Sequence, residues 1–145
     1  MAASVYADTS FLVSLYIQDA NSAKAAVTVA KLLPVCFTPL LEHELRNAIR
    51  LCVFRRQITT VQREQALHDL ESDKAAGVLH PVPLDWPKAL KHAEALGRRH
   101  TEGLDARGMD ILHVASALAL KANVFVTFDE RQRELARVAG LEVRG

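Results

Sequence analysis

Short runs of β-branched and aromatic residues alternate with longer stretches of helical period, and this alternation constrains the fold more than any other feature of the chain. It predicts strands over residues 4–7, 35–38, 78–82, 123–128 and 141–144. It predicts helices over residues 9–17, 22–33, 39–53, 60–76, 86–100, 109–121 and 130–139, with a loop over 101–108. Strands that alternate with helices form a parallel sheet with helices on both faces. We therefore expect an α/β fold, a three-layer α/β/α sandwich with a mainly parallel central sheet.

The bulk properties of the chain exclude several classes of protein. A chain of 145 residues is expected to form one domain, residues 1–145. Its formal charge of +1 argues against holding nucleic acid by net charge alone, but leaves room for a local basic patch. Cys36 and Cys52 form no CxxC pair, so we expect neither a zinc site nor a disulfide framework. We expect no signal peptide and no membrane span, and hence a cytoplasmic protein.

Two aspartates directly follow predicted strands. Asp8 lies in "VYADTSFLVSLY" and Asp129 in "VFVTFDERQ", each between a strand and a helix. The carboxyl ends of parallel strands meet at one edge of a sheet, where ligands bind in such folds. Each aspartate would also suit a helix N-cap, and Gln132, three residues after Asp129, fits a capping box. The sequence leaves both interpretations open.

A third aspartate, Asp110, lies near the start of "RGMDILHVASALALKA". The helix expected there is apolar over residues 111–120 except at His113 and Ser116, so it should be buried on most sides. An ionised carboxylate beside a core is costly unless a cation or several donors stabilise it. The alternative is an acid in the first turn, stabilised by the helix dipole.

Two glutamates compete for a fourth position in "FTPLLEHELRNAIRLCV". Glu42 and Glu44 flank the apolar stripe of this helix at similar angles on opposite sides, so the helical period does not choose between them. Either could belong to a solvated face, and Arg46 stands at i+4 from Glu42.

Carboxylates that converge on one point repel one another, and a bound cation or a proton relieves that repulsion. Ligand sets made only of oxygen favour Mg²⁺ or Mn²⁺ over zinc. Such a metal lowers the pKa of a bound water and stabilises charge on a leaving oxygen, which suits the hydrolysis of phosphodiesters. The site would need no nucleophilic side chain.

Four blocks of sequence, "ADTS", "TPLLEHELRNAI", "MDILHVASALAL" and "VFVTFDERQRELARVAGLEV", occur in the order and spacing of one family. In them the chain resembles the PIN-domain ribonucleases, in particular the VapC-type toxins. The resemblance implies the α/β/α fold and RNA cleavage that depends on Mg²⁺ or Mn²⁺. It assigns the catalytic and metal-binding roles to Asp8, Glu44, Asp110 and Asp129, and makes Glu42 a surface charge.

Hydroxyl groups near the acids are candidates for an accessory role. Thr9, Ser10 and Thr127 could hydrogen-bond a metal-bound water or a phosphate, although hydroxyls at these places also cap helices or end strands. His113 stands one turn after Asp110. It could orient that carboxylate or meet substrate, but a hydrogen-bonded histidine near the core is the interpretation that we favour.

The resemblance also implies the partners: an RNA substrate, a VapB-type antitoxin that covers the acidic pocket with a basic side chain, and a second copy in a homodimer. Basic residues that could contact RNA phosphates are Arg46, Arg50, Arg55, Arg56, Arg98, Arg99 and His100.

Two other functions compete with the nuclease. A phosphotransfer or phosphatase domain would want a second aspartate two residues after Asp8, but Ser10 stands there, and the phosphate-binding fingerprints are absent. A PIN-like module with dead chemistry, which binds RNA or protein, would be favoured by the loss of Asp8 or Asp110, and both are present.

Overall fold

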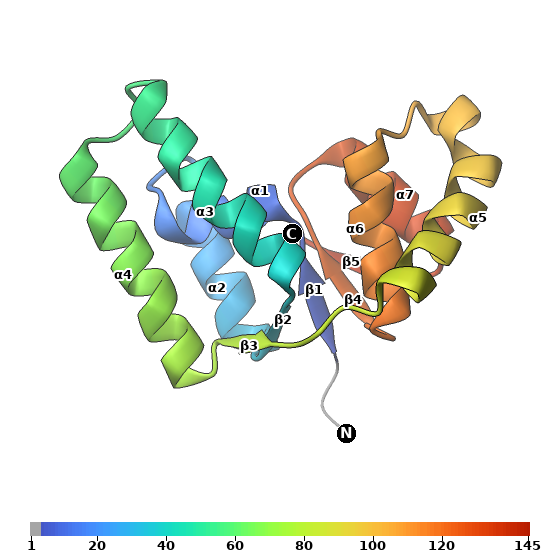
Figure 1. Cartoon of the computed structure of the whole chain (residues 1–145), viewed down its shortest axis with the longest axis horizontal. Coiled ribbons are helices and arrows are strands. Elements are labelled where there is room, and N and C mark those ends of the chain that lie inside the picture. The colour runs from blue at the N-terminus through green and yellow to red at the C-terminus, as the bar shows by residue number, and fades with distance from the viewer. Residues whose placement is uncertain (1–3) are drawn as a thin grey trace.

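The computed structural model describes residues 4–145, and in it a five-stranded parallel sheet forms the centre of the molecule (Figure 1). The strands are β1 (Val5–Ala7), β2 (Val35–Phe37), β3 (Leu79–Pro81), β4 (Val124–Val126) and β5 (Glu142–Arg144). They pair in the order β3-β2-β1-β4-β5, and every pair is parallel. Each strand lies inside a predicted range, so the predicted parallel sheet is confirmed.

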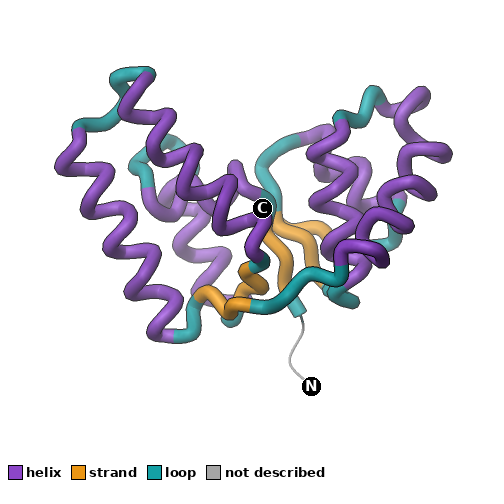
Figure 2. Tube along the Cα trace, viewed as in Figure 1, coloured by secondary structure: helices purple, strands orange, loops and turns teal. Residues whose placement is uncertain are grey.

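The helices form two groups on opposite sides of this sheet (Figures 1 and 2). They are α1 (Thr9–Tyr16), α2 (Ser22–Leu32), α3 (Pro39–Phe54), α4 (Thr60–Ala76), α5 (Trp86–Leu104), α6 (Gly108–Ala119) and α7 (Glu130–Val138). In the first helical group, α1–α4, helix α1 packs on α2 and α3, and α3 packs on α4. In the second helical group, α5–α7, helix α6 packs on α5 and α7. The predicted three-layer α/β/α architecture is confirmed.

The central strands are short, but both of their faces are covered. All three residues of β1 and of β4 are at most 3% exposed. Burial on both faces is typical of parallel sheets, whose strands read as continuous apolar runs. Among the described residues, no helix is both long enough and apolar enough to cross a membrane.

Most helix boundaries follow from capping residues in the sequence. Asp8, Asp85 and Asp129 each accept a hydrogen bond from the backbone N–H three residues on, and so cap α1, α5 and α7. Pro39 occupies the first turn of α3, as predicted. Gly77 ends α4 with a φ of +80°, a conformation that glycine adopts without strain.

The predicted loop over residues 101–108 is wrong in its first half. Helix α5 continues to Leu104, and the chain turns at Asp105, whose φ is +53°. Thr101 and Gly103 are weak helix formers, which is why the sequence favoured a loop. The side chain of Leu104 packs against the core, and this tertiary contact outweighs the local preference.

Candidate active site at the switch point of the sheet

The chain changes direction in the sheet between β1 and β4. From β1 it proceeds outward to β2 and β3, crosses back to β4, and continues on the other side to β5. Asp8 follows β1 immediately, and its backbone N–H donates to the carbonyl of Val126 on β4 at 3.1 Å. Ligands of open parallel sheets bind at such a switch point, outside the carboxyl ends of the strands.

Asp8 is both a helix cap and the most enclosed acid of this region. Its side chain is almost fully buried. Oδ1 accepts from the backbone N–H of Phe11 at 2.9 Å, and Oδ2 accepts from the Thr127 hydroxyl at 2.7 Å. The Ser10 hydroxyl lies 3.1 Å from both oxygens. Burial nevertheless raises the pKa of the Asp8 carboxyl above its ordinary value, because these bonds compensate only part of the lost hydration.

Thr127 connects Asp8 to Asp129. While its hydroxyl donates to Asp8, it accepts from the backbone N–H of Asp129 at 3.0 Å. Asp129 in turn caps α7 through the backbone of Gln132 at 2.9 Å. The buried Gln132 side chain does not complete a capping box. In the orientation that satisfies its amide, the nitrogen lies 3.3 Å from both Oδ1 and the carbonyl oxygen of Asp110.

Asp110 lies in the first turn of α6, which belongs to the second helical group. Partial burial raises the pKa of the Asp110 carboxyl, and the negative charge of Asp129 raises it further. The opposing effects of His113, Arg107 and Arg131 lower the pKa of Asp110 but do not cancel this rise. The structure therefore brings Asp110 and Asp129 close enough for their charges to interact.

Glu44 enters from α3, across from Asp110. Its Oε1 accepts from the Thr9 hydroxyl at 2.7 Å and lies 2.6 Å from Nε2 of His113. Partial burial raises the pKa of the Glu44 carboxyl, but the hydrogen bond and charge of His113, together with Thr9, outweigh burial and hold the pKa below its ordinary value.

Glu42 lies outside the cleft, between α3 and α4. Its Oε2 accepts from Nε of Arg46 at 2.9 Å and lies 3.1 Å from Nζ of Lys74. The structure thus separates the two glutamates that the helical period left equivalent.

The buried residues around these acids were only partly anticipated. His113 is 4% exposed and hydrogen-bonded, as favoured, but it contacts Glu44 rather than Asp110. Its Nδ1 lies 2.7 Å from the hydroxyl of Tyr6, a residue that sequence analysis did not select. Tyr6 could not be recognised from the sequence, because it stands in an apolar strand, where an aromatic ring is expected. The spacing of Gln132 from Asp129 suggested a capping box, but the Gln132 amide faces Asp110 instead.

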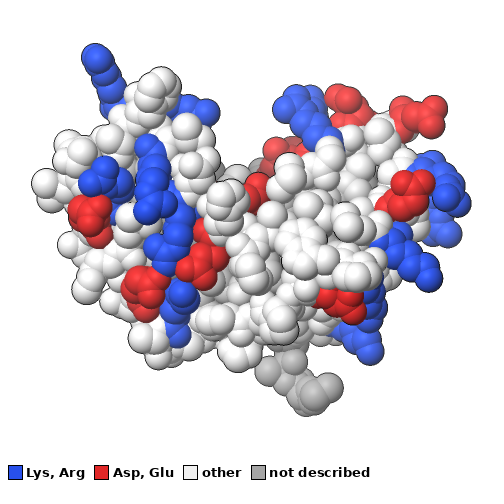
Figure 3. Space-filling view, viewed as in Figure 1, with Lys and Arg blue, Asp and Glu red and all other residues white. Residues whose placement is uncertain are grey.

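A cavity of about 490 Å³ opens between the two helical groups beside Glu44. It is lined by Thr9 of α1, Met109 of α6, and Leu40, His43, Glu44, Asn47, Ala48 and Leu51 of α3. In the space-filling view, acidic atoms lie at the bottom of the notch between the groups (Figure 3). Of the four predicted acids, Glu44 lines this cavity.

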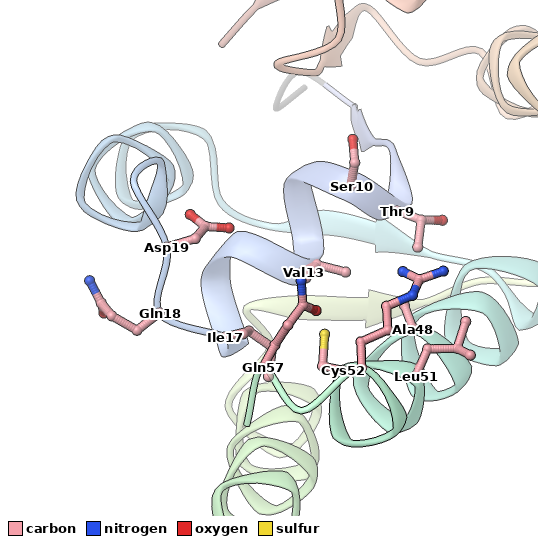
Figure 4. A pocket seen from close by; sticks show the side chains of 11 residues that line it. Thr9, Ser10, Val13, Ile17, Gln18, Asp19, Ala48, Leu51, Cys52 and Gln57 are labelled. Carbon is pink, nitrogen blue, oxygen red and sulfur yellow. The ribbon is translucent and has the colours of Figure 1, made fainter. Parts of the chain in front are cut away.

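A larger cavity, about 550 Å³, lies on the other side of Thr9 between α1 and α3 (Figure 4). Its walls include Val13, Ile17, Leu51 and Cys52, together with the charged residues Asp19 and Arg55. It contains none of Asp8, Glu44, Asp110 and Asp129. The smaller cavity is therefore the one that contains a predicted acid, Glu44.

The donor groups of the site suit a hard divalent cation. All four predicted acids offer carboxylate oxygens, and no Lys or Arg among the described residues forms a salt bridge with Asp8, Asp110 or Asp129. Throughout residues 4–145, no three His, Cys, Asp or Glu side chains are grouped so that all could ligate one ion in this conformation. Hydroxyl and amide groups connect the acids instead. The carboxylate oxygens are suitable ligands for a hard cation, but the side chains would have to change rotamer for several of them to bind one ion.

Two of the basic residues that were candidates for RNA contacts have partners within the chain. Arg46 forms ion pairs with Glu42 and Glu71, and Arg98 lies 3.5 Å from Glu94. Arg50, Arg55 and Arg56 are exposed near the end of α3. These three remain available to a ligand.

Two solved structures share the fold over nearly the whole chain. One is VapBC2 from Rickettsia felis bound to a DNA fragment from their promoter, with a TM-score of 0.65 and 16% identity over 97% of this chain and 96% of that one. The other is FitAcB from Neisseria gonorrhoeae, with a TM-score of 0.66 and 15% identity over 97% and 96%. A comparison with curated proteins gives no match.

A five-stranded parallel sheet between two helical layers defines the class of three-layer α/β/α proteins. Within that class, the sequence model of the PIN domain matches residues 5–138, and the chain belongs to the PIN-domain family. PIN domains are in general nucleases, which are hydrolases.

Proposed function

We propose that this protein is an endoribonuclease that requires Mg²⁺ or Mn²⁺ and acts as the VapC-type toxin of a toxin–antitoxin pair. The observation that carries the proposal is the electrostatics of the cleft. Asp8 and Asp110 have raised pKa values, and no salt bridge from a described residue compensates either charge. Such a site gains most from a divalent cation.

We assign the metal-ligand and catalytic roles to Asp8, Glu44, Asp110 and Asp129. The metal, when bound, would activate a water and stabilise charge on the leaving oxygen. The protein's own task is to hold the oxygens in place. Thr127 and Ser10 hold Asp8, and Thr9 holds Glu44. Gln132 holds Asp110 from below the cleft.

RNA would reach this cleft across the first helical group. The exposed residues Arg50, Arg55 and Arg56 would contact phosphates, which would position a strand without reading its bases. The near-zero net charge makes this local patch the main electrostatic attraction.

The proposed partners follow from the same family type. A VapB-type antitoxin would silence the enzyme, because an arginine placed among the carboxylates supplies positive charge and paired hydrogen bonds. The similarity in fold to VapBC2 and FitAcB supports this partner. We propose that the chain is one domain, forms a homodimer, and works in the cytoplasm, where its RNA target is found.

The test is cleavage of end-labelled RNA by the purified protein with Mg²⁺ or Mn²⁺, with and without a chelator. Asp8→Asn is expected to lower the rate by about 10²–10³-fold, because one anionic ligand is lost while its shape remains. Asp85→Asn is the matched control, since Asp85 caps α5 as Asp8 caps α1 but lies outside the cleft.

Equal cleavage by the wild type and Asp8→Asn, or cleavage that survives the chelator, would refute the proposal. Binding of RNA by a wild-type protein that cuts none under any of these conditions would instead identify an inactive PIN-like module.

A further inference from the structure

The strongest unexplained feature of the cleft is a buried chain of polar contacts beneath Glu44. It joins Tyr6 of β1, His113 of α6, Glu44 of α3 and Thr9 of α1. Tyr6 is 0% exposed and His113 is 4% exposed. Polar groups buried to this extent must satisfy one another, so the geometry of the chain is tightly specified.

The aromatic neighbours fix the two inner members. The Tyr6 ring stacks on Phe125, with centroids 5.6 Å apart and planes 14° apart. The His113 ring lies 5.9 Å from Tyr6 at a tilt of 55°. Burial raises the pKa of the Tyr6 hydroxyl, so that it retains its proton and remains a donor.

Donors and acceptors assign the protons along the chain. A carboxylate only accepts, so Nε2 of His113 carries a proton and donates to Oε1 of Glu44 at 2.6 Å. On the other side of the ring, Nδ1 lies 2.7 Å from the Tyr6 hydroxyl. Tyr6 thereby holds the imidazole ring with Nε2 facing Glu44.

Both donors to Glu44 reach the same oxygen. Thr9 and His113 bind Oε1, and no hydrogen bond from a described residue reaches Oε2. The Glu44 side chain lines the cavity between the helical groups. One oxygen is therefore held by the protein, and the other is left for a ligand.

We infer that His113, oriented by Tyr6, is a positioning residue that fixes the Glu44 carboxylate for binding a divalent cation through Oε2. The inference rests on the proposed function. Groups that orient a ligating carboxylate are worth about 10–100-fold in metal affinity. His113 is buried and its Nε2 faces Glu44 and Thr9, so it acts through the orientation of the Glu44 carboxylate.

The first test needs no metal. In the wild-type protein, nitrogen and proton NMR of His113 should show a slowly exchanging Nε2–H proton, because this proton is buried and hydrogen-bonded to Glu44. The resonance should move in Glu44→Gln, which removes the charged acceptor, and stay in place in Glu42→Gln, which changes a glutamate outside the cleft. A resonance that is insensitive to Glu44→Gln would overturn the inference.

The second test measures Mn²⁺ affinity by titration calorimetry in two amide variants. The Gln amide nitrogen takes the place of Nε2, whereas the Asn amide reaches only the place of Nδ1. His113→Gln should bind Mn²⁺ within about threefold of the wild type, and His113→Asn should bind about 10–100-fold more weakly. His68→Gln, at an exposed histidine, is the control.

Thermal unfolding of each variant separates positioning from stability. Equal Mn²⁺ affinity in His113→Asn and the wild type refutes the inference, as does an equal loss in His113→Gln and His113→Asn. If the wild type cleaves RNA and binds Mn²⁺ while His113→Asn matches it, only the inference fails. If the wild type binds no Mn²⁺, the proposed function fails with it.

Discussion

Two acidic regions of this molecule differ in whether their carboxylates form salt bridges. On the outer surface of α3 and α4, Glu42, Arg46, Glu71 and Lys74 form an ionic cluster in which both glutamates have cationic neighbours. Figure 3 shows the blue and red side chains interleaved there. In the cleft, Asp8, Asp110 and Asp129 form no salt bridge among the described residues. Partners of opposite charge are present in one region and missing in the other.

The pKa directions express this contrast. Burial raises the pKa of Glu42, but the bonds from Arg46 and Lys74 outweigh it, and the net direction is downward. Burial also raises the pKa of Asp8 and Asp110, and there the net direction remains upward. Glu44 lies between the two cases, because its partner is a histidine. Uncompensated acids of this kind mark functional sites more reliably than acidity alone.

The largest effect is expected when an acid that forms no salt bridge is neutralised. Asp110→Asn should lower metal-dependent RNA cleavage by about 10³-fold, since the cleft loses charge that only a cation would balance. Gel analysis of labelled RNA measures the rate. An Asp110→Asn protein that cuts at the wild-type rate would place the chemistry elsewhere.

The two glutamates of α3 provide a paired test of the next largest effect. Glu44→Gln should reduce cleavage by about 10²-fold, because the oxygen facing the cavity loses its charge. Glu42→Gln should leave the cleavage rate within about twofold of the wild type, since Glu42 lies outside the cleft and its charge is neutralised by Arg46 and Lys74. The reverse order would show that the register of the second acid is wrong.

Stability should change in the opposite sense to activity at Asp8. The raised pKa means that the folded state binds the Asp8 proton more tightly than the unfolded chain, so ionisation of Asp8 opposes folding. Asp8→Asn, which keeps an oxygen to cap α1, should raise the free energy of unfolding at pH 7 by about 0.5–2 kcal/mol.

The pH dependence provides the check on that prediction. The destabilisation of the wild type by Asp8 develops as pH rises from the ordinary value of 3.8 to the higher pKa of the folded state. Below pH 3.8 both states are protonated, so the advantage of Asp8→Asn should disappear there. Urea unfolding at several pH values measures it, and an advantage that does not vary with pH contradicts the electrostatic explanation.

The smallest effect is expected in the ionic cluster. Glu42→Gln should lower the free energy of unfolding by only about 0.2–1 kcal/mol, because the cluster is partly exposed and water competes for its charges. The loss should shrink in high salt. A loss that exceeds that of a core substitution would show that the cluster is far better shielded than its exposure indicates.

Much of this architecture could be predicted from local patterns. Apolar runs located all five strands, and Asp8 and Asp129 marked the shared edge because topology alone places strand ends together. The end of α5 could not be located, since Leu104 is held by tertiary packing rather than by propensity. The partners of His113 and Gln132 were also beyond reach. Each contact depends on which face of one helix packs against a distant helix: His113 meets Glu44, and Gln132 meets Asp110. The hydrophobic periodicity of a helix does not predict which other helix it will contact.

The contact between His113 and Glu44 has a mechanical consequence. His113 belongs to the second helical group and Glu44 to the first, so their hydrogen bond at 2.6 Å spans the notch between them. A force that spreads the two groups would stretch this bond, and its loss would leave Oε1 of Glu44 with the Thr9 hydroxyl as its donor. The separation of the two helical groups and the orientation of the Glu44 carboxylate are therefore coupled.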